Sequence, residues 1–406
     1  MHPKWLGLAV GILSRPFTNF APRALCRRMA LPETHVEQAE GVEGLYFKQT
    51  SQLAEILSDI PGLSSWRQWY KAPWWLRQGD LMTVASTLRE VVDLNEPEGH
   101  VIDTPDGGEL TLDFYSPLRE AAVVLLPGLG GSTRGGYVKN MAQALMSRGF
   151  QAVGLNMRGV GGLKSSRLAS AHRGSSDDVR CAVAYLRALG SRKVFVVGWS
   201  LGGNIVVNTL AEQETREGYG HSEQSFIDGG IALCATHCLI RCARQWEEHW
   251  PMRHIYDPHV MRNLKKILEP ALPFYQEPIR AWNGSMIKIQ PEQLESASRI
   301  RELDEALIRR MFGYESVDDY YYQASCSRRV AKVKVPLLMV TAADDPMATG
   351  WAPFQTVRSN EYVALAYTKH GGHIAWQDEA DARRSSWVEG VAGDFLQRLW
   401  DEGKPL

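Results

Sequence analysis

The chain has few cysteines, almost no net charge and no apolar run long enough to cross a membrane. Six cysteines among 406 residues are too few for a disulfide scaffold. The 45 Lys and Arg residues balance 46 Asp and Glu residues and are scattered along the chain. This excludes the concentrated basic surface that a nucleic-acid partner requires. The hydrophobic share of 44% is typical of a globular protein with a large core.

The first 66 residues have a mixed composition, and we leave them unassigned as an N-terminal extension. The apolar run at 5–13 has roughly half of the 20 residues that a spanning helix needs. No small-x-small cleavage site follows it. We therefore expect a cytoplasmic protein, with this segment or the later cap as the candidate contact with a membrane surface.

Cys234, Cys238 and Cys242 recur every four residues, with His237 among them. One interpretation is a metal cluster. The other is one face of a buried helix, because a free cysteine behaves as a small apolar residue. The helix is favoured, since no Cys-x-x-Cys pair of the zinc type is present. We expect neither a metal nor an organic cofactor.

From about residue 97, apolar runs of strand length alternate with amphipathic segments of helical length. This alternation predicts an α/β protein with a mostly parallel sheet covered by helices on both faces. It lapses from about 237 to 330, where a helical pattern rich in Trp, Tyr, Met and Arg indicates a cap inserted between two late strands. We expect strands at 101–104, 109–115, 121–126, 151–155, 193–198, 229–234, 336–341 and 362–367, and helices at 137–147, 176–189, 201–212 and 382–399.

The sequence Gly-Trp-Ser-Leu-Gly at 198–202 follows a predicted buried strand and opens a predicted helix. A G-x-S-x-G pattern in this setting is typical of a nucleophile elbow, whose sharp turn lifts the serine hydroxyl above the sheet edge. The two glycines allow close backbone packing, and the helix N-terminus directs N–H groups toward developing negative charge. The pattern predicts Ser200 as a nucleophile, against the alternative of an ordinary glycine-rich turn.

A serine hydroxyl needs a base, and in this arrangement an acid and a histidine follow on loops after later strands. Asp345 is favoured over Asp344 as the acid because it directly precedes a proline and its spacing from the strand suits the acid loop. His373 is favoured over His370 because the Gly-Gly pair before it lets the loop bend toward Ser200. The histidine would move the serine proton, and the aspartate would hold its tautomer.

A glycine-rich loop, Pro-Gly-Leu-Gly-Gly at 127–131, directly follows the first core strand. The backbone N–H groups of Leu129 and Leu201 are the predicted donors of an oxyanion hole. Such loops also hold phosphates, but no Gly-Lys-Ser/Thr follows and the spacing does not match G-x-G-x-x-G. We therefore do not expect a nucleotide site.

Together these motifs resemble the YheT-type branch of the α/β-hydrolases, which is related to eukaryotic membrane-associated lipases and yeast ethyl-ester synthase/esterases. The resemblance implies an α/β-hydrolase fold at 67–406 with a helical cap at about 237–330. It also implies that Arg158 and Asp304 are structural residues that tie loops to the cap. The motifs that carry the resemblance lie at 72–76 with 81–83, 156–162, 176–178, 301–305, 313–325, 344–346 and 371–373.

These observations predict a carboxylic ester hydrolase that acts on a small lipophilic acyl ester through an acyl-serine intermediate. Two other functions stay open: acyl transfer to an alcohol with the same triad, and a non-catalytic binding protein on a hydrolase scaffold. Apolar side chains of the cap could line an acyl site or form the cap's own core. They are Trp246, Trp250, Met252, Tyr256, Phe274, Tyr275, Trp282 and Met286.

Overall fold

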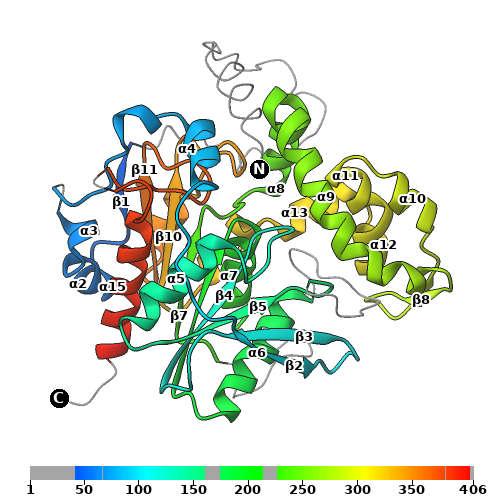
Figure 1. Ribbon diagram of the computed structural model, residues 1–406, viewed down its shortest axis with the longest axis horizontal. Coiled ribbons are helices and arrows are strands. Elements are labelled where there is room, and N and C mark those ends of the chain that lie inside the picture. Colours follow the sequence, from blue (N-terminus) through cyan, green and yellow to red (C-terminus); the bar gives the residue numbers. More distant parts are fainter. Residues whose placement is uncertain (1–41, 66, 161–173, 214–225, 380, 403–406) are drawn as a thin grey trace. The chain divides into compact units, whose positions relative to one another are not determined.

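A nine-stranded sheet is the central element of the fold (Figure 1). The structure is a computed structural model that describes residues 42–65, 67–160, 174–213, 226–379 and 381–402, so the apolar run at 5–13 lies outside the described residues. The strands are β1 (Gly44–Tyr46), β2 (Glu98–Asp103), β3 (Glu109–Phe114), β4 (Ala121–Leu126), β5 (Gln151–Asn156), β6 (Lys193–Trp199), β7 (Gly229–Leu233), β10 (Leu337–Ala342) and β11 (Val363–Thr368). Their order across the sheet is β1-β11-β10-β7-β6-β4-β5-β3-β2.

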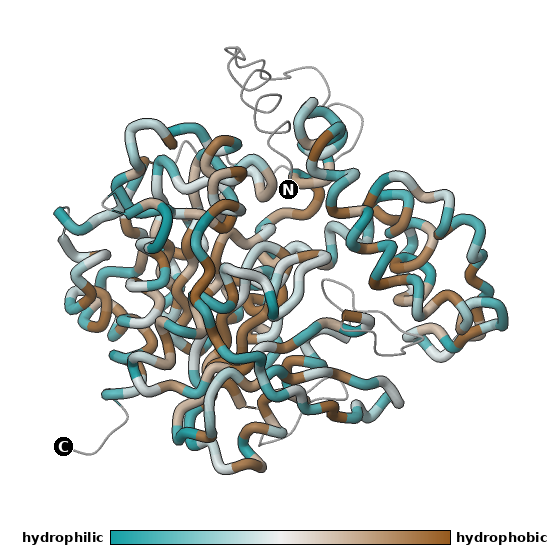
Figure 2. The backbone as a smooth tube through the Cα atoms, viewed as in Figure 1, coloured by the Kyte–Doolittle hydropathy of each residue, from teal (hydrophilic) through white to brown (hydrophobic). Residues whose placement is uncertain are grey.

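The six neighbouring strands from β11 to β5 are parallel, whereas β1, β2 and β3 pair antiparallel at the two sides of the sheet. All residues of β4, β5, β7, β10 and β11 are buried. Apolar residues accordingly fill the centre of the molecule in Figure 2. A strand with no solvated face reads as a continuous apolar run, and the predicted mostly parallel α/β sheet is confirmed.

Helices cover both faces of this sheet. α2, α3, α5 and α15 share one apolar cluster with alternate strand residues, while α6 and α7 pack together on the opposite face. Among the described helices, none combines the length and apolar character that crossing a membrane requires. The helices outside the cap are α2 (Leu53–Ser58), α3 (Pro61–Ser64), α4 (Gly79–Ser86), α5 (Gly136–Met146), α6 (Ser175–Ala188), α7 (Leu201–Ala211), α14 (Phe354–Ser359) and α15 (Trp387–Asp401), with short 3-10 turns η2 (Trp74–Leu76), η7 (Cys326–Arg328) and η8 (Val330–Lys332).

The compact unit begins earlier than residue 67, the start expected for the hydrolase domain. β1 pairs with β11 at the side of the sheet, and α2 and α3 pack against α15. The unit that contains the sheet therefore starts at Glu43.

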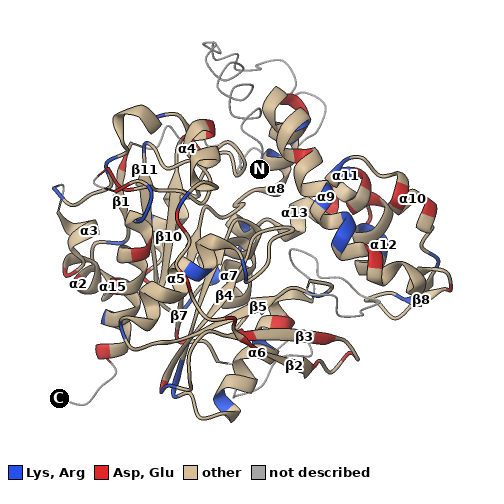
Figure 3. Ribbon diagram, viewed as in Figure 1, with Lys and Arg blue, Asp and Glu red and all other residues tan. Residues whose placement is uncertain are grey.

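A helical cap separates β7 from β10, the position predicted for it (Figure 1). Its two ends lie together, because the Ser327 N–H donates to the His237 carbonyl (3.1 Å) and the Leu239 N–H donates to the Ser325 hydroxyl (2.9 Å). Residues of both charge signs are spread over the ribbon of this cap in Figure 3. The cap comprises α8 (Leu239–Glu248), η4 (Met252–Tyr256), α9 (Asp257–Leu268), η5 (Glu269–Tyr275), β8 (Ile279–Arg280), β9 (Met286–Ile287), α10 (Pro291–Ser296), α11 (Ile300–Leu303), η6 (Asp304–Ile308), α12 (Arg309–Phe312) and α13 (Val317–Ala324).

The prediction that Cys234, Cys238 and Cys242 share one helix face is wrong. Cys234 directly follows β7, Cys238 is the N-cap of α8, and only Cys242 lies within that helix. The four-residue period therefore spans a strand end, a turn and a helix. Nearby, burial lowers the pKa of His237 to about 4, and its Nε2 contacts the Thr341 hydroxyl at 2.9 Å.

Arg158 holds two segments of the sheet domain together. Its guanidinium is 2% exposed and pairs with Asp178 at the start of α6 (2.6 Å) and with Asp106 in the β2–β3 turn (2.8 Å). Asp304 instead accepts a hydrogen bond from the Tyr321 hydroxyl within the cap (2.8 Å). Among the described residues, the partners of Arg158 thus lie outside the cap, which differs from the role that the resemblance implied for it.

Replacing Arg158 by Met should lower the free energy of unfolding by about 3–5 kcal/mol, because two buried carboxylates lose their shared cation. Urea unfolding followed by circular dichroism measures this change. Arg192→Met is the matched control, since the Arg192–Glu120 pair is 69% and 63% exposed and should contribute about 0–1 kcal/mol. Equal losses in the two variants would contradict the assigned role of Arg158.

Candidate active site

Five neighbouring parallel strands present chemically active groups at their carboxyl ends. Leu129 follows β4, Ser200 follows β6, Cys234 follows β7, Asp345 follows β10 and His373 follows β11. Carboxyl ends of parallel strands meet at one edge of the sheet, where ligands bind in open α/β sheets. The fold thus brings all four segments that carry the predicted catalytic and oxyanion residues to one edge, and adds a cysteine among them.

Ser200 occupies a strained turn between β6 and α7. Its backbone φ is 54° and ψ is −118°, a conformation that L-residues rarely adopt. The Ser200 N–H donates to the Leu233 carbonyl (2.9 Å), which anchors the turn to β7. A Cβ atom at Gly198 or Gly202 would collide with backbone atoms of Gly202 or Leu126, so both glycines are required by close packing. Strain of this kind persists where the surroundings over-determine it, as at functional sites.

His373 and Asp345 form a buried pair. The His373 Nδ1 lies 2.8 Å and 3.0 Å from the two carboxylate oxygens of Asp345, and the side chains are 4% and 0% exposed. Asp345 Oδ1 also accepts the backbone N–H groups of Met347 (2.8 Å) and Ala348 (2.9 Å). These donors compensate the carboxylate for its loss of water. The arrangement fixes a proton on Nδ1 and leaves the other ring nitrogen available as a base.

The electrostatics of this pair favour protonation of His373. Burial by itself lowers the pKa of His373. The negative charge of Asp345, the hydrogen bond to Asp345 and the nearby Cys234 raise it, and together they outweigh the effect of burial. The net pKa lies well above the ordinary value of 6.5. An imidazolium formed here is therefore stabilised by its neighbours, which is the property a general base needs at the moment it takes a proton.

The alternative residues form a second, separate pair. His370 Nδ1 lies 3.3 Å from Asp344 Oδ2, and Asp344 Oδ1 accepts the Gly372 N–H (2.9 Å). This pair is more exposed, at 23% for His370 and 19% for Asp344. Asp344 thus holds the backbone of the histidine loop, while Asp345 contacts the imidazole of His373.

Thr83 of α4 is a contact residue that sequence reasoning did not single out. Its hydroxyl accepts the His373 backbone N–H (2.8 Å) and donates to the Gly79 carbonyl (2.7 Å). The helix fits closely here, since a Cβ at Gly79 would overlap the Asp344 carbonyl. In the sequence, Thr83 was marked only by its place in the family motif at 81–83. No periodic pattern indicated that it would contact His373.

Cys234 is the second residue without a predicted role at the site. It is fully buried, has a φ of 41°, and its N–H donates to the Val340 carbonyl of β10 (2.8 Å). Its Sγ, a carboxylate oxygen of Asp345 and a ring nitrogen of His373 all lie within 4.8 Å of one another. These three residues are the group that could hold a metal ion in the described part of the chain.

The predicted oxyanion donors flank the serine turn. A Cβ at Gly128 would lie 3.2 Å from the Ser200 Cβ, so the loop before Leu129 packs directly on the elbow. Within the described residues, neither the Leu129 nor the Leu201 N–H has a hydrogen-bond partner. Gly130 faces side chains of α9, including Leu264, so the cap lies against this loop. Both N–H groups are thus free to bind an incoming oxygen.

The cap also contacts the acid loop and α4. Trp246 donates its indole N–H to the Met347 carbonyl (3.0 Å), and the Tyr256 hydroxyl donates to Asp80 Oδ1 (3.2 Å). The eight apolar cap residues named above do not act as one group. Met252 and Tyr275 are fully buried, whereas Trp250, Phe274 and Met286 are 46%, 39% and 60% exposed.

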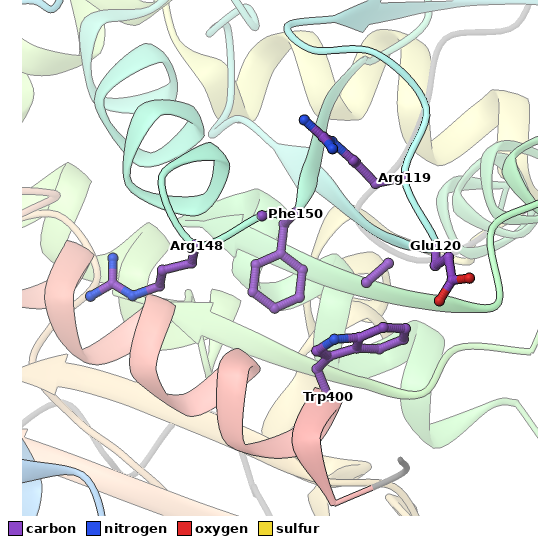
Figure 4. A pocket seen from close by; sticks show the side chains of 7 residues that line it. Arg119, Glu120, Arg148, Phe150 and Trp400 are labelled. Carbon is purple, nitrogen blue, oxygen red and sulfur yellow. The ribbon is translucent and has the colours of Figure 1, made fainter. Parts of the chain in front are cut away.

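A hollow of about 210 Å³ lies away from this edge (Figure 4). Its lining includes Ala121, the first residue of β4, and Phe150, which directly precedes β5. Trp400 of α15, Arg148, Arg119 and Glu120 also line it in Figure 4. The hollow is therefore at the amino ends of the strands, opposite the residues described above.

Replacing Thr83 by Val should lower the free energy of unfolding by about 1–3 kcal/mol, because the buried His373 N–H loses its acceptor. Thermal and urea unfolding of the purified chain measure this loss. Thr87→Val in the same segment is the control, since its exposed hydroxyl bonds only the Val84 carbonyl (2.7 Å). A Thr83 variant as stable as this control would refute the buttressing role of α4.

The chain is similar in sequence and fold to several known proteins. An abhydrolase domain-containing protein of Dictyostelium discoideum is 28% identical, over 74% of this chain and 74% of its own length. Monoacylglycerol lipase ABHD2 of Danio rerio is 25% identical, over 89% and 84%, and phospholipase ABHD3 of Mus musculus is 26% identical, over 83% and 80%. A solved esterase of Pyrococcus furiosus aligns with a TM-score of 0.47 at 14% identity, over 76% of this chain and 98% of its own.

The match to a family model identifies the superfamily, while the YheT-type branch stays a prediction. Residues 121–375 match the model described as the alpha/beta hydrolase fold, which is more than half of the chain. The matched region runs from the first residue of β4 to just beyond His373, and so contains the serine turn, the cap and the buried pair. The protein belongs to the α/β-hydrolase fold family.

Proposed function

We propose that the protein is a serine hydrolase that cleaves carboxylic esters of lipophilic acyl groups. The observation that carries this proposal is the buried hydrogen bond between His373 Nδ1 and Asp345, at the sheet edge where the strained turn holds Ser200. A base oriented by an acid, on the same sheet edge as a serine on an elbow, is the arrangement expected of an enzyme that activates a hydroxyl for attack on a carbonyl. The names of the relatives, a monoacylglycerol lipase and a phospholipase, agree with an apolar acyl group.

The reaction follows from these roles. Ser200 Oγ attacks the ester carbonyl while His373 accepts its proton, and the negative oxygen binds to the N–H groups of Leu129 and Leu201. His373 then gives the proton to the departing alcohol, which leaves an acyl-serine. Water, deprotonated by His373, attacks this ester and releases the acid. Asp345 keeps the ring in the reactive tautomer and stabilises the imidazolium in both steps.

Ser200→Ala should abolish covalent labelling by a fluorophosphonate probe and lower kcat for p-nitrophenyl esters by about 10⁶-fold, because the nucleophile is lost. Labelling is measured by in-gel fluorescence, and turnover across acyl chain lengths gives the size of the acyl site. Ser191→Ala is the control, since Ser191 is a buried serine that lies before β6, at the far end of that strand from Ser200. Unchanged labelling in Ser200→Ala would rule out Ser200 as the nucleophile.

Asp345→Asn should lower kcat by about 10⁴-fold, because the ring loses the partner that holds its reactive tautomer. The pH profile gives an independent signature. The base must be neutral, so wild-type kcat/KM should be lost as the pH falls through the raised pKa of His373, above 6.5. Removing the Asp345 charge lowers that pKa, so the remaining activity should survive to lower pH.

The matched control for this experiment is Asp344→Asn. Asp344 contacts His370 and the loop backbone instead of the His373 ring, so its replacement should leave the acidic limb of the pH profile in place. If Asp344→Asn and Asp345→Asn shifted the profile equally, the assignment of Asp345 as the acid would fail.

A further inference from the structure

Cys234 stands at the centre of the candidate site. β7 lies between β6, which carries Ser200, and β10, which carries Asp345. The residue after β7 must therefore lie between the serine turn and the acid loop. The thiol of Cys234 is fully buried there, lies within 4.8 Å of a ring nitrogen of His373, and contributes to the raised pKa of that ring. None of the catalytic steps derived above uses this thiol.

The backbone of Cys234, like that of the serine, has a positive φ. Its φ of 41° is one of five positive values at non-glycine residues in the described chain. All five fall in the turns after β6, β7, β10 and β11: Ser200, Cys234, Thr349, Ile374 and Trp376. Non-glycine residues tolerate such conformations mainly where function requires a fixed side-chain position. The strain holds the Cys234 thiol in its place beside His373.

The three neighbouring groups are a typical donor set for zinc. A thiolate, an imidazole and a carboxylate are the ligands that Zn²⁺ binds in proteins, with three protein ligands leaving one position open. Their donor atoms lie within 4.8 Å of one another here. Tetrahedral zinc places such atoms about 3.3–3.6 Å apart. An ion would draw the three groups to these separations, and the 2.8 Å His373–Asp345 contact must widen slightly to admit it.

We propose that Cys234, His373 and Asp345 form an inhibitory site for a thiophilic divalent cation of the zinc class. Binding releases the thiol proton and uses the lone pair of one ring nitrogen. Whichever nitrogen coordinates, the other then carries the remaining proton, so the ring can no longer accept the proton of Ser200. Inhibition therefore rests on the proposed function, whereas cation binding does not.

Cation binding is tested first, without any activity measurement. Co²⁺, a spectroscopic substitute for Zn²⁺, is added to the metal-free full chain, and its thiolate-to-metal charge-transfer band is recorded in the near ultraviolet. We expect one equivalent of tightly bound Co²⁺ with this band in the wild type and in Ser200→Ala, and loss of the band in Cys234→Ala. Cys242→Ala is the matched control, another buried thiol, and should keep the band.

Two outcomes of this titration would overturn the site. One is the absence of a thiolate band in the wild type. The other is a band that survives in Cys234→Ala but disappears in Cys326→Ala, which would assign the cation to the thiol 3.8 Å from His237 Nδ1. Cys234→Ser, which keeps the size of the side chain, and circular dichroism of each variant separate ligand loss from misfolding.

Inhibition is then measured on p-nitrophenyl ester turnover. Zn²⁺ should inhibit the wild type, and a chelator should restore its activity, whereas Mg²⁺, which prefers oxygen ligands, should have no effect. The half-inhibitory Zn²⁺ concentration should rise at least about 10-fold in Cys234→Ala. Equal inhibition of both proteins would refute the role of the thiol. A Co²⁺ band in an inactive protein would keep the cation site while the hydrolase proposal failed.

Discussion

Parallel hydrogen bonding along β4, β6, β7, β10 and β11 carries five distant chain segments to the same edge of the sheet. Since every strand in this group is buried on both faces, a shift in register would expose apolar residues and is resisted by the whole core. The loops after the strands begin at these fixed strand ends, so their first residues are held in place by the sheet. Groups that start more than 140 positions apart, such as Ser200 and Asp345, are thus positioned by the sheet and need few contacts of their own.

The carboxyl edge of the sheet also holds the ionisable pair His373 and Asp345, which is buried away from water. A buried ionisable pair is stable only if its remaining hydrogen-bonding capacity is used. Asp345 meets this condition through the backbone donors of the turn that follows it, while Thr83 accepts the backbone N–H of His373 and so holds the segment that carries the ring. Side chains outside the reacting groups therefore set their orientation. Backbone strain at Ser200 and Cys234 adds a cost of order 1–3 kcal/mol each, which the core has to offset.

Strands with continuous apolar runs were predictable from the sequence. A strand that is buried on both faces consists almost entirely of apolar residues, and such a run can be recognised in the sequence alone. The strand expected at 121–126 is found at Ala121–Leu126, and the order of the loops after the strands was enough to place Asp345 and His373 near one another. β1 was not predicted, since three residues that pair with a strand over 300 positions away have no local signal. The contact of Cys234 with His373 depends on strand order, which periodicity does not encode.

The adjoining ends of the cap have a consequence for how such a protein can vary. The hydrogen bond between Ser327 and His237 closes the insertion at its base. The strands on either side of the insertion are therefore connected to two neighbouring chain ends, whatever the length of the segment between those ends. The entropy of closing a loop grows with the logarithm of its length, by about 0.6 kcal/mol for each doubling. An insertion at this point can therefore be lengthened, shortened or exchanged with little thermodynamic penalty to the scaffold, which makes the cap the natural place for selectivity to diverge.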